Sequence, residues 1–520
     1  MTFCIFRYAW GTIRVRPTAR AGRKNTERSR FALEKLSDRY EENRKTLHDK
    51  LRVEDSFDLI ERRLKVGSDE LTLYYIDGFI KDAVMQRLMQ FFVGLTGLPT
   101  GEGAADRFID ASVPYVEVDA IDRVDEAILM VMSGAVVMLG STFGREAVVM
   151  DLRTYPARET EEPESDRVMQ GSRDGFVETL VFNTALIRRR LRDTRLTMQY
   201  KNLGGASKTD VVLCYMDGVA DEKYVKQLSQ RLDEIRPASL TLGFQSLAEC
   251  LIPRRWYNPF PKIRSTERPD VAAAQLVEGS VLILCDTSPQ VMILPTSIFD
   301  FMQETDDFYF APVTGTYLRL LRLSVFTLSF ILSPLWYYLV RHAELLPGWL
   351  LFVVPSEPGA FPLLLQLFLV EFAIDALKLA SMNTPNLLSN SLSVIGGLIL
   401  GDFAVTIGWL SPDVIFYMAV IAIAGFSQQS HELSYAVKFL RLITLTLTAL
   451  FGLYGLIGGV VLSVILICTN RTLNGGYSYL YPLIPFNGRA FCRLLFRVKK
   501  NDVRVTSADR ADRPGTGEKS

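Results

Sequence analysis

Apolar residues are distributed unevenly along the 520-residue chain, and two kinds of pattern follow one another. The first half has short β-rich apolar runs separated by polar segments with helical spacing, which is typical of an α/β fold. From residue 317 onward the apolar runs become long enough for membrane-spanning helices. The pattern therefore predicts an α/β soluble domain followed by an all-α polytopic membrane domain.

An internal repeat lies in the first half. LTLYYIDGFIKDAVMQRLMQ, from Leu71, and VVLCYMDGVADEKYVKQLSQRL, from Val211, each end a β-rich run in Tyr-x-Asp-Gly and continue with helical spacing. The pairs Asp77-Gly78 and Asp217-Gly218 are turn signals at strand ends. Ligands of α/β folds often lie at such ends. Turn chemistry alone explains both pairs, however, and we favour that interpretation.

A second pair of segments recurs in the same order. SGAVVMLGSTFGREAVVMDL, from Ser133, and EGSVLILCDTSPQVMILPT, from Glu278, each consist of two β-rich runs around a polar turn, which predicts a β-hairpin. Two features that recur in order indicate a duplicated α/β subdomain. We place subdomain 1 at residues 71–157 and subdomain 2 at residues 209–310.

The segments outside the repeats are more polar. Residues 1–70 are charged and are predicted to be mostly helical or disordered. Residues 158–208 form a linker with a helical pattern that carries Arg188, Arg189, Arg190 and Arg192. These arginines would either bind phosphate or lipid headgroups or lie on a solvated helix and pair with nearby acids. Both interpretations stay open at this point.

The apolar half is a predicted membrane domain over residues 317–470. The run LSVFTLSFILSPLWYYLV has no charge, is flanked by arginines and ends in aromatic residues, as a spanning helix does. The segment LLPGWLLFVV is too short to span alone, so it is either re-entrant or part of a sixth span. Residues 471–500 are membrane-proximal, and residues 501–520 are a disordered tail. The expected spans are 323–340, 361–380, 387–410, 411–426 and 442–468.

Three charges interrupt the second of these spans. In LVEFAIDALKLA, Glu371, Asp375 and Lys378 share one narrow helix face at 100° per residue. A charge inside a bilayer costs several kcal/mol unless it faces protein, water or a partner. The face therefore either lines an ion path or holds an interhelical salt-bridge network that includes an Asp375–Lys378 pair. Asp402 adds another acid in the next apolar segment.

Small residues mark two of the predicted spans. Gly397 and Gly401 form one GxxxG pattern, and Gly455 and Gly459 form another. Glycine lets two helix backbones approach closely, and close packing drives much of helix association in lipid. These four positions are therefore candidate helix-packing sites.

Composition narrows the function. Net charge is zero, with 58 acidic and 58 basic side chains, so nothing indicates a nucleic-acid partner. The six cysteines are scattered, which is typical of a reduced, cytosol-facing protein. Phosphate-loop, dinucleotide and HExxH motifs do not occur, so we expect no enzyme, no cofactor and no metal site. The basic residues after residue 488 favour a cytosolic C-terminus. If the soluble domain is cytosolic as well, the number of spans has to be even, whereas five are counted.

The chain resembles the A subunit of the GerA-type spore germinant receptors of endospore-forming bacteria. The resemblance covers roughly residues 50–490 and lies in stretches that follow the family order. The stretches are YIDG at Tyr75, EEPESDRVMQGSRDGFVETLVFNTALIRRRLRD at Glu161, GSVLILCDTSPQVMILPTSIFDFMQETDDFY at Gly279, VEFAIDALKLA at Val370, IGGLILGDFAVTIGWLSP at Ile395 and YPLIPFNG at Tyr481. Gly171, Arg173, Gly175 and Phe176 match a family motif, and so does the acid Glu371.

The resemblance implies a protein of the spore inner membrane that acts with a B subunit and a lipoprotein C subunit to sense small nutrients. It further implies that this subunit oligomerises and opens a path for monovalent cations. We expect the soluble domain to be cytosolic, because the apolar run at the N-terminus is broken at Arg7 and is too short for a signal-peptide core. Two alternatives belong to other classes. A carrier would show an inverted repeat among its spans, which we do not find. A membrane-anchored signalling adaptor would need only one span, so five predicted spans with internal charges count against it.

Overall fold

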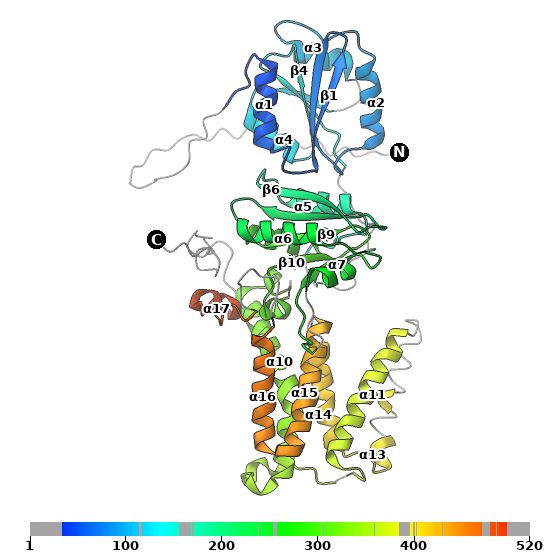
Figure 1. Ribbon diagram of the computed structural model, residues 1–520, viewed down its shortest axis with the longest axis vertical. Helices are drawn as coiled ribbons and strands as arrows, with labels where there is room; N and C mark the ends of the chain where they lie inside the picture. Colours follow the sequence, from blue (N-terminus) through cyan, green and yellow to red (C-terminus); the bar gives the residue numbers. More distant parts are fainter. Residues whose placement is uncertain are drawn as a thin grey trace, which may run out of the picture.

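The computed structural model has three parts that follow one another along its long axis (Figure 1). Two α/β subdomains come first, and a region of apolar helices follows. The structure describes residues 34–496 except 114–116, 155–167, 169–170, 238, 253–256, 305, 358, 384–395, 399–400, 402, 429, 471–478 and 485. The predicted tail, residues 501–520, lies outside the described residues.

The first subdomain is built on a five-stranded sheet in which all neighbouring strands are antiparallel. The strand order is β1-β2-β4-β5-β3, and helices cover both faces (Figure 1). The elements are α1 (Tyr40–Leu51), β1 (Leu59–Val66), β2 (Asp69–Ile76), α2 (Asp82–Val93), α3 (Ala104–Ser112), β3 (Val118–Ile121), α4 (Val124–Met132), β4 (Val136–Gly140) and β5 (Ala147–Met150).

The apolar run of β2 is buried because both of its faces are covered. Leu71 and Leu73 pack against residues of α2 and α3. Tyr74 and Ile76 point to the other face and pack against α1 and α4. A strand covered on both sides is apolar almost throughout, which explains why LTLYYI carries such a clear strand signal.

The second subdomain repeats this design. Its strand order, β6-β7-β9-β10-β8, matches that of the first sheet position for position. The predicted duplication is therefore confirmed, and the two predicted hairpins are β4–β5 and β9–β10. The elements are α5 (Leu180–Arg190), β6 (Leu196–Leu203), β7 (Thr209–Met216), α6 (Glu222–Glu234), α7 (Phe244–Leu251), β8 (Arg264–Thr266), α8 (Pro269–Val277), β9 (Val281–Cys285) and β10 (Val291–Leu294).

Both sheets begin earlier than the proposed boundaries at residues 71 and 209. β1 and β6 precede them, and each pairs along its whole length with the next strand. Both are edge strands whose exposed positions carry polar or charged side chains, as in LIERRLKV. Charges on an edge strand hide its period-two pattern, so the sequence indicated a solvated segment there.

Two of the four arginines at the end of α5 are paired with acids, whereas Arg189 and Arg192 are exposed. Arg188 is completely buried, and its Nε donates to Asp58 Oδ2 at 2.8 Å. Asp58 directly precedes β1, so this ion pair joins the two subdomains. Arg190 donates to Asp174 Oδ1 at 2.5 Å. A buried charge needs such a partner because its desolvation is costly.

The third part consists of apolar helices with short connections (Figure 1). Two described helices, α10 and α15, are long and apolar enough to cross a membrane, with mean hydropathies of 1.6 and 1.4. Shorter apolar helices, α14 and α16, accompany them. The elements are η1 (Ile298–Met302), α9 (Asp306–Tyr309), α10 (Pro312–Arg341), η2 (Ala343–Leu345), η3 (Gly348–Val353), α11 (Leu363–Asn383), α13 (Ala404–Thr406), α14 (Pro412–Phe426), α15 (His431–Phe451), α16 (Leu453–Cys468) and α17 (Gly488–Leu495).

The predicted single span at residues 442–468 is wrong. α15 ends at Phe451, and Gly452, with φ of 59° and ψ of −131°, turns the chain into α16. The two helices lie side by side (Figure 1). A Cβ at Gly455 would lie 1.9 Å from the Leu447 carbonyl oxygen, and one at Gly459 would lie 2.6 Å from Thr444. These glycines therefore allow close contact within the chain.

The helical region begins and ends at the same end of the bundle. Arg319, near the start of α10, donates to the Leu494 carbonyl oxygen of α17 at 3.3 Å. LLPGWLLFVV adds no span, because it contains η3, and Val353 accepts from Trp336 at the other end of α10. Among the described residues, α10 and α11 are followed by α14, α15 and α16, and the span predicted at residues 387–410 lies partly outside the described residues. Splitting the fifth predicted span raises the number of predicted spans from five to six.

Candidate functional site

The charged face of α11 is buried among apolar helices. Glu371, the third residue of LVEFAIDALKLA, is only 7% exposed. Asp375, one turn later, has a side chain that is 36% exposed. The predicted common face therefore exists, and it points into the protein at Glu371 and toward the surface at Asp375.

The partners of these acids come from α15. The Nη2 atom of Arg441 donates to Glu371 Oε1 and Oε2 at 2.6 and 2.7 Å. Lys438 lies 3.1 Å from Glu371 Oε1 and also pairs with Asp375. Arg441 donates in addition to the Ser329 carbonyl oxygen of α10 at 2.9 Å. Three helices therefore meet at one charge network, defined here as Glu371, Asp375, Lys438 and Arg441.

Lys378 does not take the predicted role. Its ammonium lies 4.9 Å from the ring centre of Tyr435 and 5.6 Å from that of Phe426, which is cation–π geometry. Asp375 pairs with Lys438 of α15 instead of with Lys378, so the expected Asp375–Lys378 pair is wrong. The fourth candidate, Asp402, lies outside the described residues.

A small cavity adjoins the charge network. It has a volume of about 60 Å³, and Glu371, Asp375, Lys378 and Lys438 contribute to its wall. A water molecule occupies about 30 Å³ in the liquid, so this space holds about two waters. Gln428 lines the same cavity, and neither the Nε2 nor the Oε1 of its buried amide has a hydrogen-bond partner among the described residues. Such an amide is suited to bind water or a small polar species.

Sequence reasoning missed Arg441, Lys438 and Gln428. The first two are three residues apart and so lie on one face of α15, as Glu371 and Asp375 do on α11. That spacing could have predicted a second charged helix face. It could not have paired this face with Glu371 and Asp375, because the sequence does not show that α15 lies opposite α11. No sequence pattern pointed to Gln428.

The motif Gly171 to Phe176 docks the second subdomain onto the segment before α10. Gly171 has φ of +130°, and a Cβ there would lie 2.5 Å from the Tyr309 ring in α9. Arg268 donates to the Ser172 carbonyl oxygen at 2.8 Å. Phe176 is buried in the core of the subdomain and Gly175 beside it, whereas Arg173 is exposed.

Two carboxylates stabilise this docking. Burial opposes ionisation of Asp174, but hydrogen bonds from Arg190 and Ser172 outweigh it and lower the pKa of the carboxyl. Burial also opposes ionisation of Asp270, and hydrogen bonds from Arg268 and Tyr309 likewise lower its pKa. Both groups are therefore held as carboxylates.

The Asp-Gly pairs lie in turns, as the favoured interpretation expected. Gly78 and Gly218 follow β2 and β7 with φ of 80° and 68°. Asp77 Oδ1 accepts from the Gly78 amide at 3.0 Å, and burial raises the pKa of this carboxyl. Asp217 pairs with Arg52 at 2.9 Å. Turn geometry and contacts to neighbouring residues account for both pairs.

Gly397 and Gly401 differ from the other pair of packing candidates. A Cβ at either position would meet no atom of the described residues within 4 Å. Gly455 and Gly459, by contrast, contact α15. Whether Gly397 and Gly401 contact another helix stays a prediction.

Comparisons with known proteins place the chain in a family. The family model described as "Bacillus/Clostridium GerA spore germination protein" matches residues 45–507. Stage V sporulation protein AF of Bacillus subtilis (strain 168) is 36% identical over 452 residues, which cover 86% of this chain and 90% of that protein. Spore germination protein KA of the same organism is 29% identical over 479 residues, which cover 90% and 87%.

A solved structure matches half of this chain. It is the N-terminal domain of the A subunit of the Bacillus megaterium spore germinant receptor GerK3. The match is 25% identical, covers 50% of this chain and 96% of that chain, and has a TM-score of 0.38. The match over residues 45–507 and the identities along nearly the whole chain show that this protein belongs to the GerA spore germination protein family.

Proposed function

We propose that this chain is a membrane subunit of a germinant-receptor complex and that the charged face of α11 lines a path for monovalent cations. The observation that supports this role is the charge network itself. Acids inside apolar helices are costly to maintain and are typical of ion and proton pathways. The water-sized cavity beside Glu371 and Asp375 supplies polar space next to these acids.

The setting of this subunit is part of the proposal. Family membership supports a place in the spore inner membrane, with α10, α11, α14, α15 and α16 in the bilayer. We propose a cytosolic soluble domain, a B subunit and a lipoprotein C subunit as partners, and a homo-oligomer. The open space beside Gly397 and Gly401 supports contacts with another copy.

Ion flux from liposomes tests the conduction role. The full chain is compared with Glu371→Gln, with Asp375→Asn and with a chain that lacks residues 1–310. We expect each charge-removing variant to lower cation flux roughly tenfold, equivalent to about 1.4 kcal/mol of lost stabilisation of the ion. Arg87→Gln, on the exposed face of α2, is the control for removing a charge.

Two outcomes would contradict this proposal. One is unchanged flux in correctly assembled Glu371→Gln and Asp375→Asn proteins. The other is the absence of flux from oligomers, both of this chain alone and with its partner subunits. Either result would leave the network with a structural role only.

One comparison favours a second candidate function. The identity to Stage V sporulation protein AF, 36%, exceeds the identity to spore germination protein KA, 29%. The chain would then act while the spore forms rather than when it germinates. Deleting the gene separates the two: loss of heat-resistant spores before any nutrient is added indicates sporulation. Normal spore yield with a lost nutrient response indicates germination.

A further inference from the structure

Apolar side chains are exposed in two segments at the end of the helical bundle that faces the second subdomain (Figure 1). In the first turn of α10, Val313 is 83% exposed, and before α17, Phe486 is 71% exposed. The two segments are in contact, because Arg319 of α10 donates to the Leu494 carbonyl oxygen of α17 at 3.3 Å. The exposed apolar residues at this place, called the boundary residues here, are Val313, Tyr317, Leu483, Ile484, Phe486 and Phe496.

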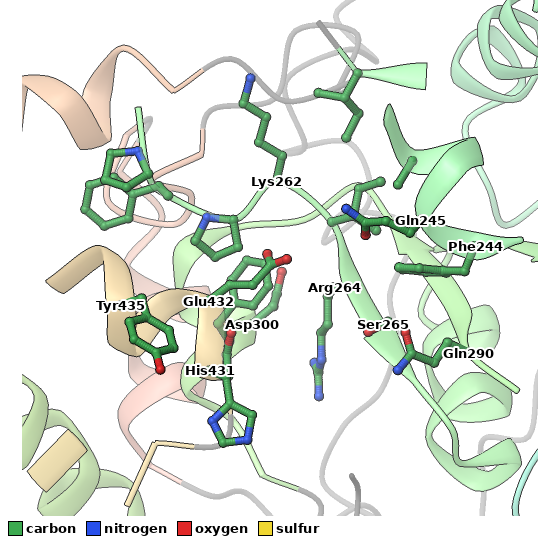
Figure 2. Close-up of a pocket in the computed structure, with 18 of the residues that line it drawn as sticks. Phe244, Gln245, Lys262, Arg264, Ser265, Gln290, Asp300, His431, Glu432 and Tyr435 are labelled. Carbon is green, nitrogen blue, oxygen red and sulfur yellow. The ribbon is translucent and has the colours of Figure 1, made fainter. Parts of the chain in front are cut away.

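The segment before α17 is held in a fixed position. Tyr479 is buried, and its hydroxyl donates to the Pro261 carbonyl oxygen at 2.8 Å. Pro261 belongs to the wall of a cavity of about 770 Å³ between the second subdomain and α15, so this bond ties the segment to the junction of the two halves (Figure 2). The Asn487 side chain caps α17, and the ring centres of Phe486 and Phe491 lie 6.1 Å apart. These contacts fix the side of the molecule on which Phe486 is exposed.

The arginines that precede the predicted span at residues 323–340 are not available to lipid. Arg319 and Arg322 are each 8% exposed. Arg322 pairs with Asp307 at 2.9 Å and also with Glu304. Arg319 lies 3.4 Å from the same Asp307 carboxylate. Arginines at the end of a span usually extend to the lipid headgroups. Because these two compensate acids of the protein, contact with the headgroups falls to other residues.

The C-terminal segment supplies positive charge next to the boundary residues. α17 contains Arg489 and Arg493, which are four residues apart in the sequence, and Arg497, Lys499 and Lys500 follow it. No acidic residue occurs in the sequence between α16 and Lys500. A short helix that combines exposed apolar residues with basic ones is typical of elements that lie in the surface of an anionic bilayer.

We infer that α17 and the boundary residues bind the surface of an anionic lipid bilayer. The apolar side chains enter the outer part of the hydrocarbon, and the basic residues pair with the negatively charged headgroups. At 100° per residue, Val313, Tyr317 and Leu328 lie within about 60° of one another around α10. Leu328 belongs to the predicted span and is 40% exposed, so the boundary residues adjoin the surface that lipid covers. This continuity favours lipid over a partner protein as the occupant. The inference rests on the proposed membrane setting of α10, but not on ion conduction.

Quenching by brominated lipid tests this contact in the full chain. A single bimane label is placed at Cys492 of α17, at Cys250 of the second subdomain, or at Leu328→Cys in α10, and the remaining exposed cysteines and Cys4 are replaced by serine. The nanodiscs contain phosphatidylcholine brominated near the headgroup end of its acyl chains, with or without phosphatidylglycerol. We expect the Cys492 label to be quenched about threefold more strongly with phosphatidylglycerol than without it. The Cys250 label should not be quenched.

Variants separate the charge from the apolar contact. Arg489→Gln/Arg493→Gln should abolish the increase that phosphatidylglycerol causes, and high salt should do the same in the chain without these substitutions. Arg231→Gln/Arg236→Gln, at exposed positions of the second subdomain, removes the same charge and should leave the increase unchanged. Phe486→Ser should lower quenching of the α17 label in both lipids.

Each result decides for or against lipid contact. An unquenched Cys492 label beside a quenched Leu328→Cys label overturns the inference and assigns the boundary residues to a protein partner. Equal quenching at Cys492 with and without phosphatidylglycerol overturns the assignment to anionic lipid. If neither label is quenched, α10 does not cross the bilayer, and the membrane setting itself is wrong. Because no ion flux is measured, failure at Cys492 alone leaves the conduction proposal intact.

Discussion

Arg441 is the main partner that compensates the buried charge of Glu371. Its Nη2 donates to both oxygens of the carboxylate, and Lys438 supplies a second positive charge. Taking either partner away leaves a buried charge with incomplete compensation. Such a loss costs about 3–5 kcal/mol, whereas removing both charges of a buried pair is often close to neutral.

We therefore expect Arg441→Gln to lower the free energy of unfolding by about 3 kcal/mol, because Glu371 stays buried and charged. The double variant Glu371→Gln/Arg441→Gln should recover most of that loss. Thermal unfolding of the purified chain in detergent measures both. Additive losses in the double variant would show that the two side chains do not depend on each other.

At this scale the sequence predicted half of the network. The common face of Glu371 and Asp375 follows from helical spacing alone. Their partners do not, because no spacing rule says which face of α15 lies opposite α11. Lys378 was the nearest cation in sequence, yet Lys438 forms the pair. Contacts between distant helices depend on packing, which a single sequence does not display.

The helices α15 and α16 pack so closely that two positions of α16 have no room for a side chain. Leu447 and Thr444 of α15 lie where side chains at Gly455 and Gly459 of α16 would be. Gly458, on another face of α16, has no atom within 4 Å of the position of a Cβ. The same helix therefore holds glycines that the packing needs and one that it does not.

Gly455→Ala should lower the free energy of unfolding by about 1–3 kcal/mol, because the Leu447 backbone has to move. Gly458→Ala is the matched control and should be neutral or stabilising by up to about 1 kcal/mol, since alanine favours the helix. Circular dichroism during heating compares them. Equal effects of the two substitutions would mean that the close contact is not needed.

Elements were predictable where polarity changes sharply. The β-rich runs and the spans at residues 323–340 and 411–426 correspond to strands and helices of the structure. The break at Gly452 was missed because apolar residues continue on both sides of it, and only its backbone angles mark the turn. β1 and β6 were missed for the opposite reason, since edge strands tolerate charges.

At the scale of the whole molecule, the α/β subdomains and α17 lie at the same end of the helical bundle. The soluble subdomains precede α10, and α17 contacts the start of the same helix. An even number of passes would place the basic C-terminal segment and the α/β subdomains on the same side of the membrane. The turn at Gly452 raises the predicted number of spans from five to six, which is the even number that two cytosolic ends require.

Thiol labelling measures this arrangement. Cys250, in the second subdomain, and Cys492, in α17, are exposed, and Cys4 and Cys468 are replaced by serine. Burial raises the pKa of the Cys214 and Cys285 thiols, so both react slowly. An impermeant reagent should modify Cys250 and Cys492 from the same side of sealed vesicles. Modification from opposite sides would contradict the even number of passes.

The charges around the small cavity affect how cations approach it. Glu371 and Asp375 are negative, while Lys378, Lys438 and Arg441 are positive, so the cluster keeps one net positive charge. A sodium or potassium ion approaching it at rest meets repulsion as well as a narrow space. If ions pass along this face, the positive charge opposes the entry of cations even where the helices leave enough room for them.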